Sequence, residues 1–239
     1  MAVKWVFFDI GDVLFDENAQ HQWLFHTLLQ TLRAHGKTVE WDEFNQTRKR
    51  LVSEGPNPEA AIKGALAFYC VNTSETETLW QEARHAYGEM RKPRPYGFLL
   101  DNITGVLEDL KRDFHLGIIA NQHPPITQAL ENYGVAALFD IIVISETVHL
   151  FKPDPAIFRL GLDQAQITPA EAVFVGDRPD NDIAPARALG MKTVRFKRGI
   201  QYVYFNPPDP AQTADVVVED VSGLAEAVRQ AASLETQPA

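Results

Sequence analysis

The residues best suited to chemistry are two aspartates that each follow a short apolar run, Asp9 after residues 3–8 and Asp177 after residues 172–175. Runs of β-branched and aromatic residues are typical of buried parallel strands. In open sheets built from such strands, ligands bind outside the carboxyl ends. Carboxylates gathered there repel one another unless a cation or a proton joins them. The pattern therefore predicts a metal site built from residues far apart in the chain.

The second aspartate opens a cluster of oxygen-bearing side chains that follows Gly176, namely Asp177, Asp180, Asn181 and Asp182. Carboxylate oxygens suit Mg²⁺, which takes one or two of them and keeps several waters. We expect Asp177 and Asp182 to be the ligands. The alternative is that Asp180, Asn181 and Asp182 cap the helix that follows. Capping explains one such residue rather than the whole cluster, so a metal site is favoured.

A lysine and an asparagine complete the set of candidates. Lys152 lies in Leu-Phe-Lys-Pro-Asp-Pro, just before a predicted helix, where prolines restrict the backbone. Its ammonium could hold a nearby carboxylate ionised and contact a phosphate oxygen. Asn121 follows another strand-like run, and its amide and backbone N–H could donate to the same oxygens. A solvated lysine and a turn asparagine are the alternatives.

The elements that must position these residues alternate along the chain. We expect strands over 3–8, 116–120, 141–144, 172–175, 192–196 and 215–218. We expect helices over 102–112, 125–132, 155–165, 183–189 and 222–232. Strands and helices that alternate with short links predict right-handed crossovers and a parallel sheet. The expected fold class is α/β, a parallel sheet with helices on both faces.

The stretch between the first two strands has a different pattern. Apolar residues recur at helical spacing, as in Leu24, Leu28 and Leu32, and no convincing strand is visible. We therefore expect an inserted all-helical domain over residues 16–94. Residues 1–15 and 95–234 would form the core, and 235–239 would be a frayed tail.

Composition narrows the class of partner. Lys and Arg number 22 and Asp and Glu number 32, which gives a formal net charge of −10. This balance argues against nucleic acid or an anionic membrane as the main partner, because both need basic patches. No apolar run approaches the roughly 18 residues that span a bilayer. A single cysteine and no visible secretory leader lead us to expect a cytoplasmic protein. The oligomeric state stays open.

Taken together, these positions resemble the motifs of the haloacid dehalogenase (HAD) superfamily, whose members are mostly Mg²⁺-dependent phosphohydrolases. The resemblance covers nearly the whole chain and is carried by Asp9, Ala120–Asn121, Lys152 and Gly176–Asp177 through Asp182. It implies that Asp9 is the nucleophile, that Lys152 is catalytic, and that Ala120, Asn121 and Lys152 contact the substrate. It also implies that Asp9, the carbonyl of Gly11 and Asp177 hold Mg²⁺, with Asp182 in or beside the coordination sphere. The resemblance further implies a Rossmann-like core, a parallel sheet with helices on both faces, over residues 1–15 and 95–234. The helical insertion over residues 16–94 resembles the superfamily's cap domain.

The chain departs from that pattern at two positions. Gly11 stands where the superfamily usually has a second Asp, the general acid and base, whose loss costs about 10²–10⁴-fold in rate. Ala120 stands where a Ser or Thr hydroxyl usually holds the phosphoryl group, and that hydrogen bond is worth about 1.5–3 kcal/mol. Asp12 and His123 could substitute in proton transfer, although an extended chain would point Asp12 the other way.

Three functions follow from the resemblance. The leading hypothesis is a Mg²⁺-dependent phosphatase that acts on a small phosphorylated metabolite through an aspartyl-phosphate. The alternative, motivated by Gly11 and Ala120, is a catalytically weakened HAD-like protein that acts by binding a ligand or partner. A 2-haloacid dehalogenase is the third hypothesis, since those relatives also lack the second Asp, but they work without metal. The substrate is not specified by the sequence.

Overall fold

The protein's structure is a computed structural model that describes residues 2–54, 58–91, 96–199, 203–207 and 209–234. The expected tail at 235–239 lies outside the described residues. The chain divides into two compact units, which we call the core unit and the helical unit. The core unit comprises Met1–Asp16, Phe98–Arg198 and Asp209–Ala239, and the helical unit comprises Glu17–Gly97 and Gly199–Pro208.

The core unit is built on a six-stranded sheet in the order β5-β4-β1-β6-β7-β8, and every neighbouring pair is parallel. The strands are β1 Trp5–Phe8, β4 His115–Ala120, β5 Ile141–Ile144, β6 Ala172–Gly176, β7 Lys192–Phe196 and β8 Val216–Val218. The predicted Rossmann-like parallel sheet is therefore confirmed. β1 and β6 lie side by side at its centre, so the residues that follow these two strands emerge next to each other.

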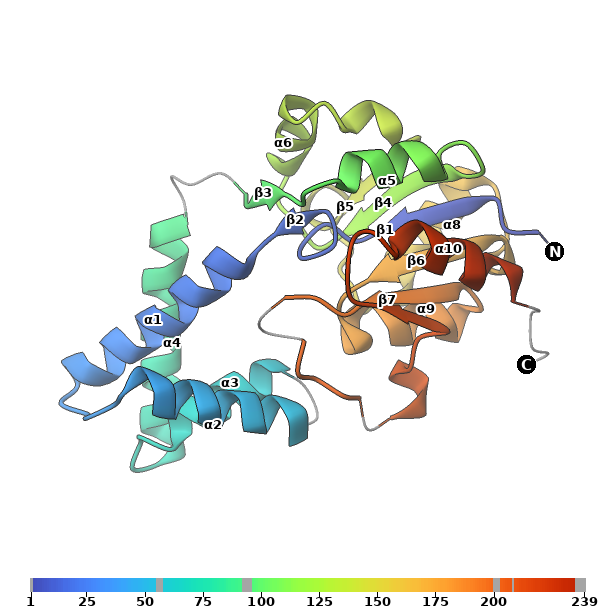
Figure 1. Cartoon of the computed structure of the whole chain (residues 1–239). Helices are drawn as coiled ribbons and strands as arrows, with labels where there is room; N and C mark the ends of the chain where they lie inside the picture. The colour runs from blue at the N-terminus through green and yellow to red at the C-terminus, as the bar shows by residue number, and fades with distance from the viewer. Residues whose placement is uncertain (1, 55–57, 92–95, 200–202, 208, 235–239) are drawn as a thin grey trace. The chain divides into compact units, whose positions relative to one another are not determined.

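Helices cover both faces of this sheet, as Figure 1 shows. The helices of the core unit are α5 Ile103–Leu110, α6 Ile126–Asn132, α7 Ser145–Val148, α8 Pro155–Ala165, α9 Ala184–Leu189 and α10 Leu224–Ser233. α10 packs on β6, β7 and β8 beside α5, and α8 and α9 pack on the other face. Trp5 and Phe7 of β1 contribute to the apolar cluster that includes Ile157 and Phe158 of α8.

The start of α8 illustrates how local sequence sets an element. Pro155 occupies the first turn, where its missing N–H costs nothing, and the Asp154 carboxylate accepts a hydrogen bond from the Ala156 backbone N–H at 2.8 Å. The helix ends at Ala165, and the capping residue Gln166 takes a left-handed conformation with φ of 56°. Pro155 and the Asp154 cap therefore set where α8 begins, three residues after Lys152.

Two short strands were not expected from the sequence. β2 Phe15–Asp16 pairs antiparallel with β3 Phe98–Leu99, and this ribbon lies where the chain leaves and re-enters the core unit. Strands of two residues show no period, so apolar patterning cannot reveal them.

The helical unit contains α1 Asn18–Ala34, α2 Trp41–Glu54, α3 Pro58–Ala67 and α4 Thr73–Arg91. Its interior is formed by apolar residues from all these helices, including Phe25, Leu28, Phe44, Leu66 and Trp80. Arg48 shares the buried face of α2, with its guanidinium carbon 4.3 Å from the centre of the Phe25 ring.

A second segment of the chain belongs to the helical unit. Phe205 is fully buried in a cluster with Val52 and Ala61, and the division into units places Gly199–Pro208 with the helices. The boundaries drawn from the sequence assigned these residues to the core. Aromatic residues without a period carry no signal of the unit they pack on, which is why the sequence could not indicate this.

An ion pair joins the residues that precede the two central strands, β1 and β6. Lys4 Nζ lies 2.5 Å from Glu171 Oε1, and the Thr168 backbone N–H donates to Glu171 Oε2 at 3.0 Å. These hydrogen bonds, from Lys4 first and then Thr168, lower the pKa of Glu171 to about 2. The contact joins residues that are far apart in the chain.

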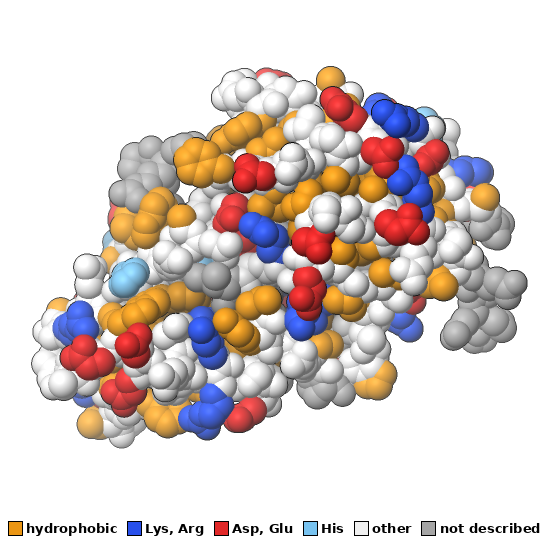
Figure 2. All heavy atoms as spheres, viewed as in Figure 1, with side chains coloured by type: hydrophobic (Ala, Val, Ile, Leu, Met, Phe, Trp, Pro, Cys, Tyr) orange, Lys and Arg blue, Asp and Glu red, His pale blue; other side chains and the backbone are white. Residues whose placement is uncertain are grey.

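The surface and the helices bear on possible partners. On the face shown in Figure 2, acidic and basic side chains of the described residues are interspersed rather than gathered into one field. Within the described residues, no helix combines the length and apolar character needed to cross a membrane.

Candidate active site

The site is built around a buried ion pair between Lys152 and two aspartates. Lys152 Nζ donates to Asp9 Oδ1 at 2.7 Å and to Asp182 Oδ1 at 2.6 Å. The side chains of Lys152, Asp9 and Asp182 are 1%, 13% and 0% exposed. Asp9 directly follows β1, and its backbone N–H donates to the Val175 carbonyl of β6 at 2.9 Å. The sheet therefore sets the position of the Asp9 carboxylate, which keeps a small opening to solvent.

The ammonium of Lys152 stays charged in this setting. Burial alone would lower the pKa of Lys152, but the charges of Asp182 and Asp9 and their hydrogen bonds outweigh it and raise the pKa above its ordinary value. The ammonium also lies 5.5 Å from the centre of the Phe174 ring. Lys152 is thus a fixed buried cation, and the alternative of a solvated surface lysine is wrong.

The loop after β6 brings Asp182 back onto the strand end. It forms a single π-helical turn over Pro179–Ile183, and the Arg178 backbone N–H donates to Asp182 Oδ2 at 3.0 Å. A Cβ at Gly176 would lie 2.4 Å from the Cβ of Asp182, so only glycine allows this approach. Asp180 is held differently, since its carboxylate pairs with the Arg178 guanidinium at 3.0 Å.

Three carboxylates meet at the carboxyl ends of β1 and β6. Asp9, Asp177 and Asp182 each offer one oxygen, and these oxygens lie within 4.8 Å of one another. Burial raises the pKa of Asp177 well above its ordinary value, and the charges of Asp182 and Asp9 raise it further. Burial also raises the pKa of Asp182, against the opposing effect of Lys152. A cluster of oxygen donors with excess negative charge fits a hard divalent cation such as Mg²⁺.

Gly11 and Asp12 form the turn that follows β1 and Asp9. Gly11 makes an isolated bridge with Phe15, and Asp12 takes a left-handed conformation with φ of 52°. Asp12 is buried, and its charge contributes to the raised pKa of Asp177. The turn thus brings the Asp12 carboxylate within electrostatic range of the acidic cluster, which an extended strand would not do.

Asn121 and Ala120 lie at the end of β4. The Asn121 side chain forms two hydrogen bonds with the backbone of Lys152. Its Nδ2 donates to the Lys152 carbonyl and its Oδ1 accepts from the Lys152 N–H, each at 2.8 Å. Its side chain therefore positions the catalytic lysine candidate. Ala120 is fully buried and offers no hydroxyl at this end of the strand.

His123 continues the same loop and is paired with a carboxylate. His123 Nδ1 lies 2.5 Å from Glu146 Oε1, and the two side chains are 63% and 40% exposed. Glu146 was not among the candidates from the sequence, although an acidic residue just after the strand 141–144 was a usable signal. Arg195 was also missed; it is buried in β7 in register with Gly176, and burial lowers its pKa against the charge of Asp177.

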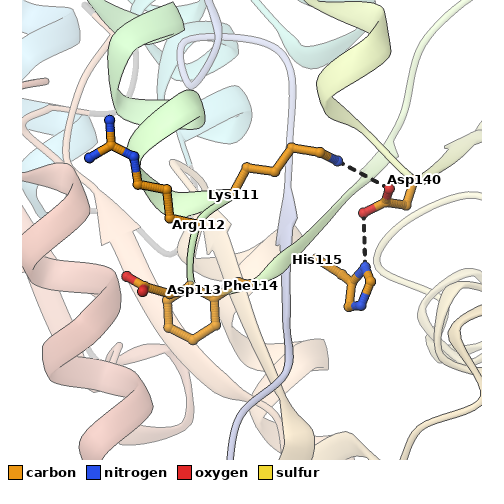
Figure 3. Close-up of a pocket in the computed structure, with 6 residues that line it drawn as sticks. All are labelled: Lys111, Arg112, Asp113, Phe114, His115 and Asp140. Carbon is orange, nitrogen blue, oxygen red and sulfur yellow. Dashed lines mark hydrogen bonds and ion pairs between the residues drawn. The ribbon is translucent and has the colours of Figure 1, made fainter.

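A separate pocket of about 290 Å³ lies at the amino ends of β4 and β5. Figure 3 shows the side chains of Lys111 and His115 directed toward Asp140. Lys111 Nζ is 3.0 Å and His115 Nδ1 is 3.1 Å from the Asp140 carboxylate. This pocket lies away from the carboxyl ends of the strands. Lys111, His115 and Asp140 therefore form ion pairs outside the candidate site, with which substitutions in the site can be compared.

Comparisons with known proteins are consistent with this geometry. A sequence model of a family described as haloacid dehalogenase-like hydrolase matches residues 6–196. The chain is 32% identical over 174 residues to a phosphoserine phosphatase of Thermus thermophilus, and the match spans 73% of this chain and 60% of that protein. It is 36% identical over 184 residues to a glyceraldehyde 3-phosphate phosphatase of Methanopyrus kandleri, spanning 77% of this chain and 70% of that protein.

The fold is shared with a solved structure that is described as a dehalogenase. A 2-haloacid dehalogenase of Pseudomonas syringae matches 95% of this chain and 99% of its own with a TM-score of 0.57 and 24% sequence identity. At that level of identity the likeness concerns the fold alone, so the reaction must be argued from the site.

Proposed function

Because the chain belongs to the haloacid dehalogenase-like hydrolase family, we propose that it is a Mg²⁺-dependent phosphatase that acts on a small phosphorylated metabolite. The observation that carries the proposal is the Asp9 carboxylate, held by Lys152 beside Asp177 and Asp182 at one end of the sheet. The two phosphatase relatives are named for small phosphate monoesters, which supports the same substrate class here.

Asp9 acts as the nucleophile. A carboxylate oxygen of Asp9 attacks phosphorus, the bond from phosphorus to the alcohol oxygen breaks, and an aspartyl-phosphate forms. Water then attacks phosphorus, which releases inorganic phosphate and restores the carboxylate. Lys152 holds the nucleophile in place and offers its ammonium to a phosphate oxygen, while the Asn121 side chain fixes the Lys152 backbone.

Mg²⁺ would be held by Asp9, Asp177 and the carbonyl of Gly11, with Asp182 in or next to the coordination sphere. When bound, the ion would neutralise charge between the carboxylates and the phosphoryl group and orient both. Lys152 and Asp182 form a pair that fixes one wall of this site without the ion. Because the ligand at position 11 would be a backbone carbonyl, the missing carboxyl group there does not remove it.

The second candidate function is favoured by Gly11 and Ala120. The missing carboxyl group at position 11 lowers the expected rate by about 10²–10⁴-fold, the usual contribution of a proton-transfer residue. The missing hydroxyl at position 120 removes one hydrogen bond of about 1.5–3 kcal/mol, which corresponds to about 10–150-fold. Enzymes exceed uncatalysed phosphate-monoester hydrolysis by up to about 10²¹-fold, so turnover can survive both losses. Binding of phosphorylated ligands without release of phosphate, across a broad panel, would favour the weakened protein.

The test is phosphate release from a panel of phosphorylated metabolites in the presence of Mg²⁺. Asp9→Asn is expected to abolish turnover with an unchanged circular dichroism spectrum. Asp140→Asn is the matched control. That carboxylate lies at the amino end of β5, away from the candidate site, so its loss should not affect turnover. Full activity of Asp9→Asn would refute the assigned nucleophile. An activity on 2-haloacids that is indifferent to EDTA would instead revive the dehalogenase hypothesis.

A further inference from the structure

The proposed phosphatase needs a proton donor that its first motif does not supply. An alcohol leaves phosphorus as a poorly stabilised alkoxide unless a proton reaches its oxygen, and the later attack of water needs a base. Gly11 has no side chain for either step. This inference rests on the proposed function and asks which other residue of the core unit can carry the proton.

The loops after β4 and β5 hold a histidine and a glutamate together. The Gln122 N–H donates to Ser145 Oγ at 3.1 Å, and Ser145 Oγ donates to the Gln122 carbonyl at 3.3 Å. His123 follows Gln122 and Glu146 follows Ser145 in the sequence. The side chains of these two residues are in contact, with His123 Nδ1 2.5 Å from Glu146 Oε1. The pair is therefore set by a local framework rather than by two free surface side chains.

This framework is continuous with the reacting groups. Asn121, two residues before His123, bonds to the backbone of Lys152, whose ammonium contacts Asp9. Two further residues extend the chain by at most about 7 Å, so the loop keeps His123 near this end of the sheet. In phosphoryl transfer the leaving oxygen lies opposite the attacking one. The leaving group therefore points away from Asp9, and the loops that hold His123 and Glu146 start from this same end of the sheet, after β4 and β5.

Exposure favours His123 over Asp12 for this role. Asp12 is 2% exposed and its charge acts on Asp177, within the carboxylate cluster. The His123 side chain is 63% exposed, as a group that must meet both the leaving alcohol and water requires. Because the Glu146 carboxylate can only accept, Nδ1 carries a proton and Nε2 becomes the exchanging nitrogen.

We propose that His123, oriented by Glu146, is the proton-transfer residue that takes over from the missing carboxyl group at position 11. In the first step the Nε2 proton of the imidazolium passes to the leaving oxygen, which keeps the electron pair of the broken bond to phosphorus. In the second step neutral Nε2 takes a proton from the attacking water, and the bond from phosphorus to Asp9 breaks with its electrons returning to the carboxylate. The imidazolium is restored, and Glu146 stabilises it as a positioning residue.

The test compares two leaving groups. p-Nitrophenyl phosphate releases a stabilised phenolate without protonation, whereas glycerol phosphate releases an alcohol that needs the proton. For His123→Ala we expect kcat/KM on glycerol phosphate to fall about 10²–10⁴-fold and kcat/KM on p-nitrophenyl phosphate to change much less. Its slowed second step should give a burst of nitrophenolate equal to the enzyme concentration. Glu146→Gln should shift both readouts in the same direction by a smaller factor.

His115→Ala is the matched control. His115 is likewise exposed and paired with a carboxylate, Asp140, but this pair lies at the amino ends of β4 and β5, away from the candidate site. This variant should leave both substrates unaffected. An equal loss on both substrates, or no loss, in His123→Ala would overturn the assignment while the phosphatase proposal stands. If the unaltered protein with Mg²⁺ releases phosphate from neither substrate nor the wider panel, the proposed function fails and this inference fails with it.

Discussion

Replacing Lys152 by methionine removes the ammonium that joins Asp9 and Asp182 while keeping an unbranched apolar stem of about the same length. Both contacts are short, at 2.7 and 2.6 Å, and the lysine side chain is 1% exposed. Without the ammonium, the carboxylates of Asp9 and Asp182 lose the cation that they share. We therefore expect the variant to fold with a markedly reduced free energy of unfolding.

The expected magnitude follows from this burial. Removing one partner of a buried pair leaves an uncompensated charge and costs about 3–5 kcal/mol. For a chain of this size, each kcal/mol lowers the melting temperature by about 2–4 °C, which gives a shift of about 6–20 °C. Loss of one donor to the reacting phosphoryl group should also lower kcat by about 10²–10³-fold.

The assay is scanning calorimetry without metal at neutral pH, with Lys111→Met as the matched control. Lys111 forms an ion pair of similar length with Asp140, at 3.0 Å, but its side chain is 32% exposed. Such partly solvated pairs contribute about 0–1 kcal/mol. A loss in Lys152→Met no larger than in the control would refute the argument that desolvation makes the Lys152 pairs strong.

Three further predictions concern packing and pH. Gly176→Ala should lower the free energy of unfolding by about 1–3 kcal/mol and weaken Mg²⁺ binding, because the new Cβ would collide with Asp182. The control Gly105→Ala has open space around the new Cβ and should leave the free energy of unfolding unchanged or raise it. Glu171→Gln should reduce stability above pH 4.5, and this difference should shrink as the pH falls toward the folded-state pKa of about 2, where the native carboxyl group is also protonated. Phe205→Ala should destabilise the helical unit by about 3–5 kcal/mol in calorimetry, because it empties a fully buried position.

Much of the core could be predicted because its strands are continuous apolar runs. The strand predicted over 141–144 has the same bounds as β5, and the helix predicted over 155–165 has the same bounds as α8. Both are bounded by residues with a strong local preference, such as Pro155. The ribbon of β2 and β3 escaped prediction because two-residue strands depend on tertiary pairing alone.

The candidate site could be predicted as a set of positions but not as a set of contacts. The positions of Asp9 and Asp177 follow from the ends of parallel strands, which meet at one edge of the sheet. The sequence could not show that Asp180 turns toward Arg178 while Asp182 folds back onto Gly176, since that choice depends on one π-helical turn. The partnership of His123 with Glu146 also depends on the pairing of two loops.

The most direct test of the account is a calorimetric titration with Mg²⁺ of the unaltered protein, Asp177→Asn and Asp180→Asn. Asp177 and Asp180 lie in the same loop, but only Asp177 shares the carboxylate cluster with Asp9 and Asp182. We predict binding by the unaltered protein and by Asp180→Asn, and at least about a tenfold loss of affinity, equivalent to 1.4 kcal/mol, in Asp177→Asn. No detectable Mg²⁺ binding, or binding that Asp177→Asn leaves unchanged, would contradict a metal-assisted reaction at Asp9.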